Sequence, residues 1–412
     1  MDVNDLTLTT SFGWIDFSKE QRNKVGAVLD LLKFEGMVDE LGLGTVRDIL
    51  ADRMFPGIST IQTKAKYFFY IPYILWDYQL LPPGQKKKIS PSKFLDDTEH
   101  EIMWELAPKY QDGDGVIGIS KKKTERIARR PSAIYWNGLY TFGLIDTRGL
   151  GAESFLKNCA KRTLSDLLSS SSNGDDVTKD DAEVDFENIF RIKIPYKKDW
   201  RNNLTIELDE GEAQILKDHI KSRANKTLLS LLVEEDKIWN VFSAADNFSE
   251  FATACESLKM PSPIFKEIQL AHDFSELMYG SHLFYNVMIQ EKKFGNGFYL
   301  NEWESWKNRI LDNLMLGNAF NPDEIFSLGK VNRDETVLFI KEFWKMANQG
   351  FEDEKSLKRI ITNQEFGVKG GKARIFPEKL HDVKEKEWIG LRHFEYRFRQ
   401  AKVIINDIRN PK

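Results

Sequence analysis

The chain has 412 residues, of which 41% are hydrophobic, and it carries a formal net charge of -4 with an isoelectric point near 6.0. This length and composition suffice for two or three packed domains and exclude a chain that is disordered throughout. The mild acidity excludes a uniformly basic nucleic-acid coat, so any nucleic-acid binding must come from a local patch.

The first 60 residues predict short helices joined by tight turns. Ser18 and Gln21 form a capping box before a helix expected over 19–36. Thr45 and Asp48 form a second box, which follows a glycine-containing turn and precedes a Pro-Gly turn at 56–57. A helix is therefore expected to begin near Thr45.

Residues 59–146 predict a buried helix, a loop and then three further helices. The apolar residues that follow Ser59 recur at helical spacing, although Pro72 is expected to kink or end that helix. A proline- and lysine-rich loop is expected at 82–93. Helices over 94–110, 120–130 and 132–142 follow, and together they suit a helix-turn-helix or winged-helix module at 94–146. An ordinary helical subdomain with a solvated basic face is the alternative.

An acidic serine-rich run divides the chain. Between 169 and 188 there are seven carboxylates against one lysine, a composition typical of a linker. Residues 189–208 then alternate like a small pair of strands, and Asp209 begins a mostly helical remainder that ends in an apolar stripe over 391–408. We therefore predict a mainly α protein with a helical N-terminal domain at 1–168, an acidic linker at 169–188, and a C-terminal domain at 189–412 that combines a small β element with helices.

The cysteines and the apolar runs indicate a cytoplasmic protein. Only Cys159 and Cys255 occur, so neither a disulfide framework nor a cysteine metal site is expected. The first ten residues lack the apolar core of a signal peptide. The longest apolar run, at 67–76, has about ten residues, whereas a membrane span needs ~20. We expect no membrane partner.

Local basic surface is the strongest functional signal. The segment 119–130 holds six cations and one carboxylate and precedes Asn137. The cations would contact phosphates, and Asn137 would contact bases. A second basic loop surrounds Gly370 and Gly371, whose backbone N-H groups would help to seat a phosphate. Each patch could equally be a solvated face, and Tyr135 and Trp136 are expected in the core. The predicted nucleic-acid-binding residues are Lys121, Lys122, Lys123, Arg126, Arg129, Arg130, Asn137, Lys369, Lys372 and Arg374.

Catalytic signals are few. Asp39, Glu40 and Asp48 surround a glycine turn that could hold a metal ion or a substrate, but such a stretch is more often a structural turn in which Asp48 caps a helix. His272 and His282 lie about 80° apart on one predicted helix and are poor co-ligands. Neither a P-loop nor a nucleophile elbow occurs. We therefore expect no cofactor and no metal, and we leave open whether the chain has any activity.

Six sequence blocks carry a family resemblance that extends over nearly the whole chain. They are SFGWIDFS at 11–18, DELGLGTVRDILADRMFPGISTIQTKAKYFFYIPYI at 39–74, RRPSAIYWNGLYTFGLI at 129–145, SELMYGSHLFYNVMI at 275–289, NQEFGVKGGKARI at 363–375 and FEYRFRQAKVIINDIRN at 394–410. Together they resemble one bacterial domain-of-unknown-function family. The resemblance implies a place in anti-phage defence neighbourhoods, beside helicases or phospholipase-D-like nucleases, and it carries over no catalytic residue.

These observations favour a non-catalytic, nucleic-acid-binding accessory subunit of a bacterial anti-phage defence system. Its expected partners are nucleic acid, with DNA favoured over RNA, and a helicase or phospholipase-D-like nuclease. One alternative is a metal-dependent nuclease that uses Asp39 and Glu40. The other is a scaffold whose basic residues meet an acidic partner protein.

Overall fold

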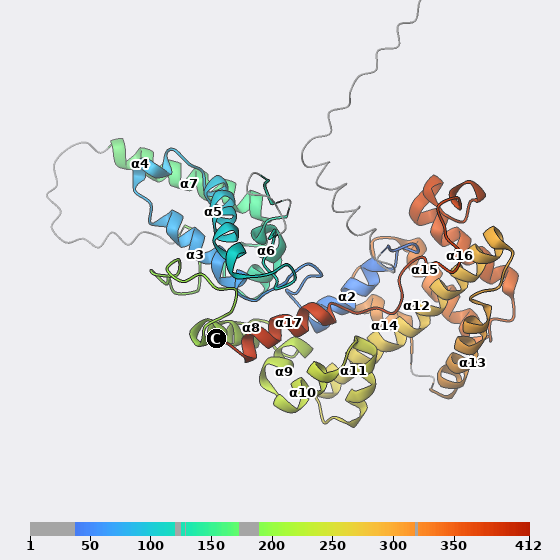
Figure 1. Cartoon of the computed structure of the whole chain (residues 1–412). Coiled ribbons are helices and arrows are strands. Elements are labelled where there is room, and N and C mark those ends of the chain that lie inside the picture. The colour runs from blue at the N-terminus through green and yellow to red at the C-terminus, as the bar shows by residue number, and fades with distance from the viewer. Residues whose placement is uncertain (1–37, 120–124, 128, 173–188, 318–319) are drawn as a thin grey trace, which may run out of the picture.

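The computed structural model describes residues 38–119, 125–127, 129–172, 189–317 and 320–412. These residues form an assembly of helices that contains no strand, which confirms the mainly α prediction (Figure 1). The helices are α2 (Gly44–Met54), α3 (Tyr67–Gln79), α4 (Pro83–Lys86), α5 (Pro91–Leu106), α6 (Pro131–Thr141), α7 (Ala152–Ser172), α8 (Glu210–Arg223), α9 (Leu228–Glu234), α10 (Asp236–Ala244), α11 (Phe248–Ala254), α12 (Ser262–Phe294), α13 (Leu300–Gly317), α14 (Pro322–Leu328), α15 (Asp334–Asn348), α16 (Glu354–Lys369) and α17 (Phe398–Arg409).

The first group of helices packs around α3. This helix is apolar on nearly every side and contacts both α5 and α6, while α7 also packs against α5 and α6. Pro72 lies inside α3 but does not end it, and the helix begins at Tyr67, later than expected. Because aromatic and aliphatic side chains on all sides of α3 are buried, tertiary packing outweighs the backbone hydrogen bond that proline removes.

The middle helix expected for a helix-turn-helix module is absent from the part of 120–130 that the structure describes. Residues 125–127 and 129–130 are not helical. Arg130 is extended, with ψ of 150°, because the following Pro131 disfavours the helical conformation at the preceding residue. The helices α5 and α6 agree with the two flanking predictions.

The strand pair expected over 189–208 does not form. The segment makes one isolated antiparallel bridge, between Ile145 and Ile192, and otherwise follows irregular turns. Side chains of α3 bind its backbone instead: Trp76 donates to the carbonyl of Ile194 and Tyr70 to that of Thr205. Strand pairing is therefore not needed to satisfy these buried polar groups.

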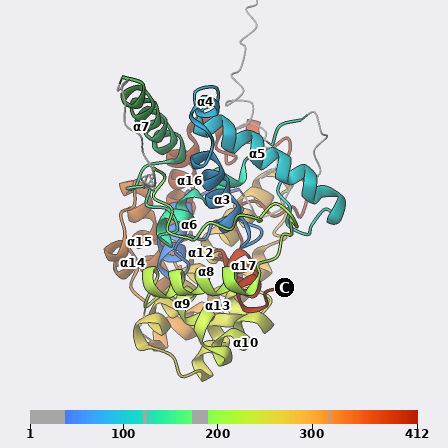
Figure 2. The ribbon, with the colours of Figure 1, turned by 90° about the vertical axis from the view of Figure 1, so that its left-hand side faces the viewer.

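Helices from the two sides of the predicted linker share contacts. The early helix α2 packs against α9, α12 and α14. In both views α17 lies beside α8, below α3 and α6 (Figures 1 and 2). The helix α7 extends to Ser172, four residues into the predicted linker, and the rest of that linker lies outside the described residues. The domain boundaries stay a prediction.

An irregular segment at 384–397 crosses α12 and is held by polar side chains of that helix. Asn286 donates to the carbonyl of Ile389 and accepts from its N-H, each at 2.8 Å, and Ser275 accepts from the N-H of Phe394. The terminal helix α17 therefore starts only at Phe398, and the predicted stripe over 391–408 is helical in its second part alone. Arg397 has a left-handed backbone with φ of 67°, which separates the two parts.

Within the described residues, no helix is long and apolar enough to cross a membrane.

Candidate functional site

The acidic turn at 39–48 begins α2, but not through the predicted capping box. Asp39 accepts hydrogen bonds from the N-H groups of Leu43, at 2.9 Å, and Gly44, at 2.6 Å. Its carboxylate therefore fills the capping role that Thr45 was expected to play, because the glycine turn brings Asp39 close to the first turn of the helix. Asp48 is half-exposed and pairs with Arg47 at 2.9 Å.

Glu40 links the acidic turn at 39–48 to the basic loop around Gly370 and Gly371, two segments that lie far apart in the sequence. Its side chain is completely buried and contacts the ammonium group of Lys369 and, at 3.2 Å, the guanidinium group of Arg374. Both cations belong to the basic loop that was predicted to seat a phosphate. Lys372 is exposed and forms no ion pair with any described residue. The glycine loop therefore has one cation available for a ligand, and the other two are matched by an internal carboxylate.

The surroundings of this ion-pair cluster order the backbone. Glu365 is buried and accepts from the N-H groups of Arg374 and Ile375 and from the hydroxyl of Tyr285. Burial raises the pKa of Glu365, and these hydrogen bonds oppose the shift. No three His, Cys, Asp or Glu side chains among the described residues lie close enough together to hold a metal ion.

His282 of α12 is a buried neutral side chain that senses the charge of Asp39. Burial lowers its pKa, against opposition from the Asp39 charge and the carbonyl of Met278. Its Nδ1 lies 3.1 Å from that carbonyl, and its Nε2 has no hydrogen-bond partner in the described part of the chain. His272 lies on the same helix but bonds Ser249, at 3.1 Å from Nε2, so the two histidines have separate partners.

The basic segment before α6 divides into paired and unpaired cations. Lys121, Lys122 and Lys123 lie outside the described residues. Arg126 pairs with Asp96 at 3.0 Å and with Asp97 at 2.9 Å, and Arg130 lies 3.5 Å from Asp96. Arg129 is exposed and pairs with no carboxylate that the structure describes.

One side of α6, which begins two residues after Arg129, is exposed. Ala133, Asn137 and Tyr140 are exposed, and their spacing places them on one side of the helix. Tyr135 and Trp136 are buried, as predicted: the Tyr135 hydroxyl bonds the backbone of Thr63 and Lys64, and the Trp136 indole donates to Leu150. We call Arg129, Ala133, Asn137 and Tyr140 the α6 surface.

A buried carboxylate that the sequence reasoning missed anchors α6. Glu99 accepts from the N-H of Ser132 at 2.5 Å and from its hydroxyl at 3.0 Å, at the first turn of α6. Burial raises the pKa of Glu99 to about 8, although both bonds from Ser132 oppose the shift. Its position on the apolar face of the 94–110 pattern, between Leu95 and Met103, was the available signal.

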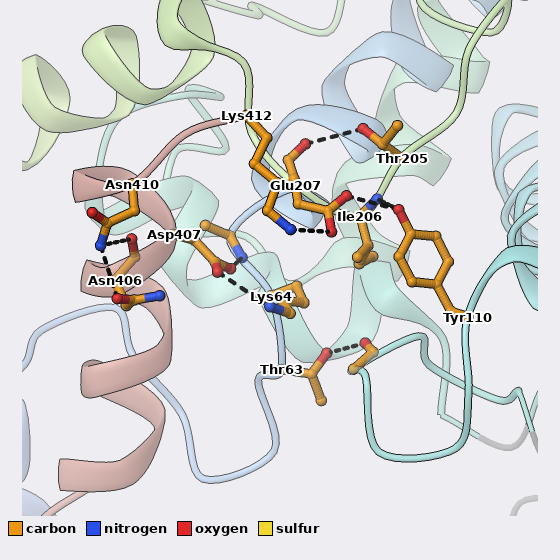
Figure 3. Close-up of polar contacts among 12 residues, drawn as sticks. Thr63, Lys64, Tyr110, Thr205, Ile206, Glu207, Asn406, Asp407, Asn410 and Lys412 are labelled. Atoms are coloured by element: carbon orange, nitrogen blue, oxygen red, sulfur yellow. Dashed lines mark hydrogen bonds and ion pairs between the residues drawn. The ribbon is translucent and has the colours of Figure 1, made fainter.

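The structure also contains a cleft that no local sequence pattern indicated. Figure 3 shows polar contacts among several residues in and beside this cleft. The cleft has a volume of about 650 Å³ and includes Lys64, Tyr110, Glu207, Arg399 and Lys412 in its lining. The Tyr110 hydroxyl donates to Glu207 at 2.7 Å and accepts from the N-H of Ile206. We call it the Lys64 cleft. Its residues extend from Gln62 to Lys412, 350 positions apart, which explains why sequence reasoning did not find it.

Burial and charge oppose each other in Asp407, which pairs with Lys64 beside this cleft, and in Glu207, which lines it. Burial raises the pKa of Asp407, although the Ala65 N-H and the Lys64 ammonium group, at 3.3 Å, stabilise the ionised form. Burial also acts to raise the pKa of Glu207, but the hydrogen bond from Tyr110 and the Lys412 charge bring it below its ordinary value. Glu207 is therefore an ionised acceptor at neutral pH.

Comparison with known proteins identifies a family but no activity. No curated protein and no solved structure matches the chain significantly. One family matches over residues 9–402, which is nearly the full length, and it is described as a family of unknown function, DUF6361. The chain therefore belongs to the DUF6361 family.

Proposed function

We propose that this protein is a nucleic-acid-binding accessory subunit that contacts DNA through the basic segment at 121–130 and the α6 surface. The observation that supports this most is the exposed stripe of α6. Arg129 precedes the helix without a carboxylate partner in the described part of the chain, and Asn137 and Tyr140 are exposed on one side of α6. An amide for a base edge and an aromatic ring for stacking thus share one face of the helix, and a cation for phosphate precedes that helix in the chain.

The second predicted patch supports the proposal less. Lys369 and Arg374 would have to leave the buried Glu40 carboxylate in order to bind a phosphate, and Glu40 would then be buried without a partner. We therefore assign nucleic-acid contact to the N-terminal basic segment, with Lys372 as the one exposed cation of the glycine loop.

The same arrangement disfavours the nuclease alternative. A metal ion at Asp39 and Glu40 would compete with two N-H groups at the start of α2 for the first carboxylate and with two cations for the second.

The place in an anti-phage defence system, beside a helicase or phospholipase-D-like nuclease, rests on the family resemblance of the sequence blocks. Cytoplasmic localisation is part of the same proposal.

The test is the salt dependence of binding to a labelled 30-base-pair duplex. Replacing Lys121, Lys122, Lys123 and Arg129 by alanine should weaken binding and lower the slope of log affinity against log salt by about 0.9 for each lost phosphate contact. The matched control removes four exposed lysines from the C-terminal half, Lys259, Lys330, Lys345 and Lys355. Equal losses in the two variants would indicate a general charge effect and contradict the assignment.

The defence context has a separate test. A tagged copy of the protein, purified from its own host, should bring down a helicase or a phospholipase-D-like nuclease encoded next to it. Recovery without either partner would contradict the role as their accessory subunit, and it would leave the binding measurement unaffected.

A further inference from the structure

We propose that the Lys64 cleft binds a mononucleotide, at a site separate from the α6 surface. The two sites lie on opposite sides of α6, because the buried Tyr135 bonds the backbone of Thr63 and Lys64, whereas Asn137 and Tyr140 point away from that contact. The cleft volume of about 650 Å³ falls within the range of roughly 300–1,000 Å³ that is typical of small-molecule sites.

Three cations from different segments meet at the cleft. Lys64 precedes α3, Arg399 lies in the first turn of α17, and Lys412 follows that helix. The Lys64 and Lys412 ammonium groups lie 3.3 and 3.4 Å from carboxylate oxygens, longer than the ~2.7–2.9 Å of a tight charged hydrogen bond. Arg399 is exposed and forms no ion pair with the described residues. A phosphate group can therefore gain contacts without breaking a tight pair.

The carboxylates of the cleft suit the sugar of a nucleotide. Glu207 is held between Tyr110 and Lys412, and a carboxylate with spare lone pairs accepts hydrogen bonds from a ribose diol. A long polyanionic strand would instead meet repulsion from Glu207 and from Asp114, which also lines the cleft. The mixed charge thus favours a ligand with one anionic end over a nucleic-acid strand.

Two further side chains suit a base. Tyr110 is fixed by hydrogen bonds at its hydroxyl, so its ring is a preorganised stacking surface. Gln62 lines the cleft and is 4% exposed; its amide nitrogen donates to Gly57, while its Oε1 has no partner in the described residues. A buried amide oxygen without a donor costs free energy, and the amino group of a base would supply that donor.

The test is calorimetric titration of the full chain with ATP, GTP, CTP and UTP, each up to about 1 mM. At least one should bind, and both inorganic phosphate and the matching nucleoside should bind at least about tenfold more weakly. Arg399→Gln and Glu207→Gln should each weaken nucleotide binding about tenfold, because each removes a charged contact. Lys402→Gln, on the same helix but bonded to the Ala245 carbonyl, is the control and should change binding less than about twofold.

Three results would overturn the proposal: no binding of any of the four nucleotides, equal binding in both cleft variants and the wild type, or preferential binding of an oligonucleotide to the cleft. Unfolding midpoints of all variants verify that they are folded. The alanine variant of Lys121, Lys122, Lys123 and Arg129 should keep its nucleotide affinity, so failure of this site and failure of the proposed nucleic-acid surface are distinguishable.

Discussion

Replacing Glu40 by glutamine should destabilise the protein by more than any substitution of a surface carboxylate. Glu40 is fully buried and is the carboxylate that Lys369 and Arg374 share. Removing one partner from a buried ion pair costs about 3–5 kcal/mol. Because the side chains of Lys369 and Arg374 are 19% and 32% exposed, water offsets part of this loss, and we expect ~2–3 kcal/mol. The unfolding constant should rise about 30- to 150-fold.

The assay is urea unfolding followed by tryptophan fluorescence, with Asp48→Asn as the control. Asp48 is 44% exposed and pairs with Arg47, so its substitution should cost less than about 1 kcal/mol. Lys369→Met, alone and combined with Glu40→Gln, measures the coupling of the pair, which should exceed about 1 kcal/mol. The reasoning is refuted if Glu40→Gln is no more destabilising than Asp48→Asn.

Further predictions concern pH dependence and close packing. Burial raises the pKa of Glu99 from its ordinary 4.5 to about 8, so the folded state holds a proton that the unfolded chain releases. Stability should therefore fall as pH rises from 4.5 to about 8, by up to about 1.4 kcal/mol per pH unit, and Glu99→Gln should abolish that fall in pH-dependent urea titrations. Gly280→Ala should lower stability by about 1–2 kcal/mol, because the added methyl group overlaps Trp306. Gly371→Ala has open space around it and should change stability by less than about 0.5 kcal/mol. Calorimetric melting of both variants measures the difference.

Helices with strong local signals were predictable from the sequence. Asp209 and Glu212 form the capping box that begins α8, and the apolar spacing around 94–110 and 132–142 matches α5 and α6. In each case the residues that determine the helix lie within one or two turns of one another, so their periodicity is visible in the sequence. The burial of Tyr135 and Trp136 followed from the same pattern.

Elements held by distant side chains were not predictable. The apolar and polar residues of the segment at 189–208 alternate as they do in strands. Tyr70 and Trp76 of α3 nevertheless donate hydrogen bonds to its carbonyl groups, and no local sequence pattern indicates those bonds. Likewise, the irregular course of 384–397 depends on Asn286 and Ser275, about a hundred residues earlier. Long-range hydrogen bonds to the backbone therefore decided the conformation against local propensity.

The candidate sites also combine features that the local sequence indicated with features that depend on contacts between distant residues. Sequence spacing identified the acidic turn and the glycine loop as charged segments, but their charges neutralise each other through Glu40 only in the folded protein. The Lys64 cleft combines residues from both ends of the chain and has no local signature. Of the predicted residues in and after the basic segment that the structure describes, Arg129 and Asn137 are exposed and belong to no ion pair with a described residue.

Site-specific crosslinking tests the central claim most directly. A photoreactive amino acid at Asn137, on the α6 surface, should crosslink to a labelled DNA duplex at low salt, and the yield should fall as salt is raised. The same amino acid at Lys345, an exposed position on α15, is the control and should give little product. Equal crosslinking at the two positions, or none at Asn137 while the protein still binds DNA, would contradict the assignment of α6 as the nucleic-acid interface.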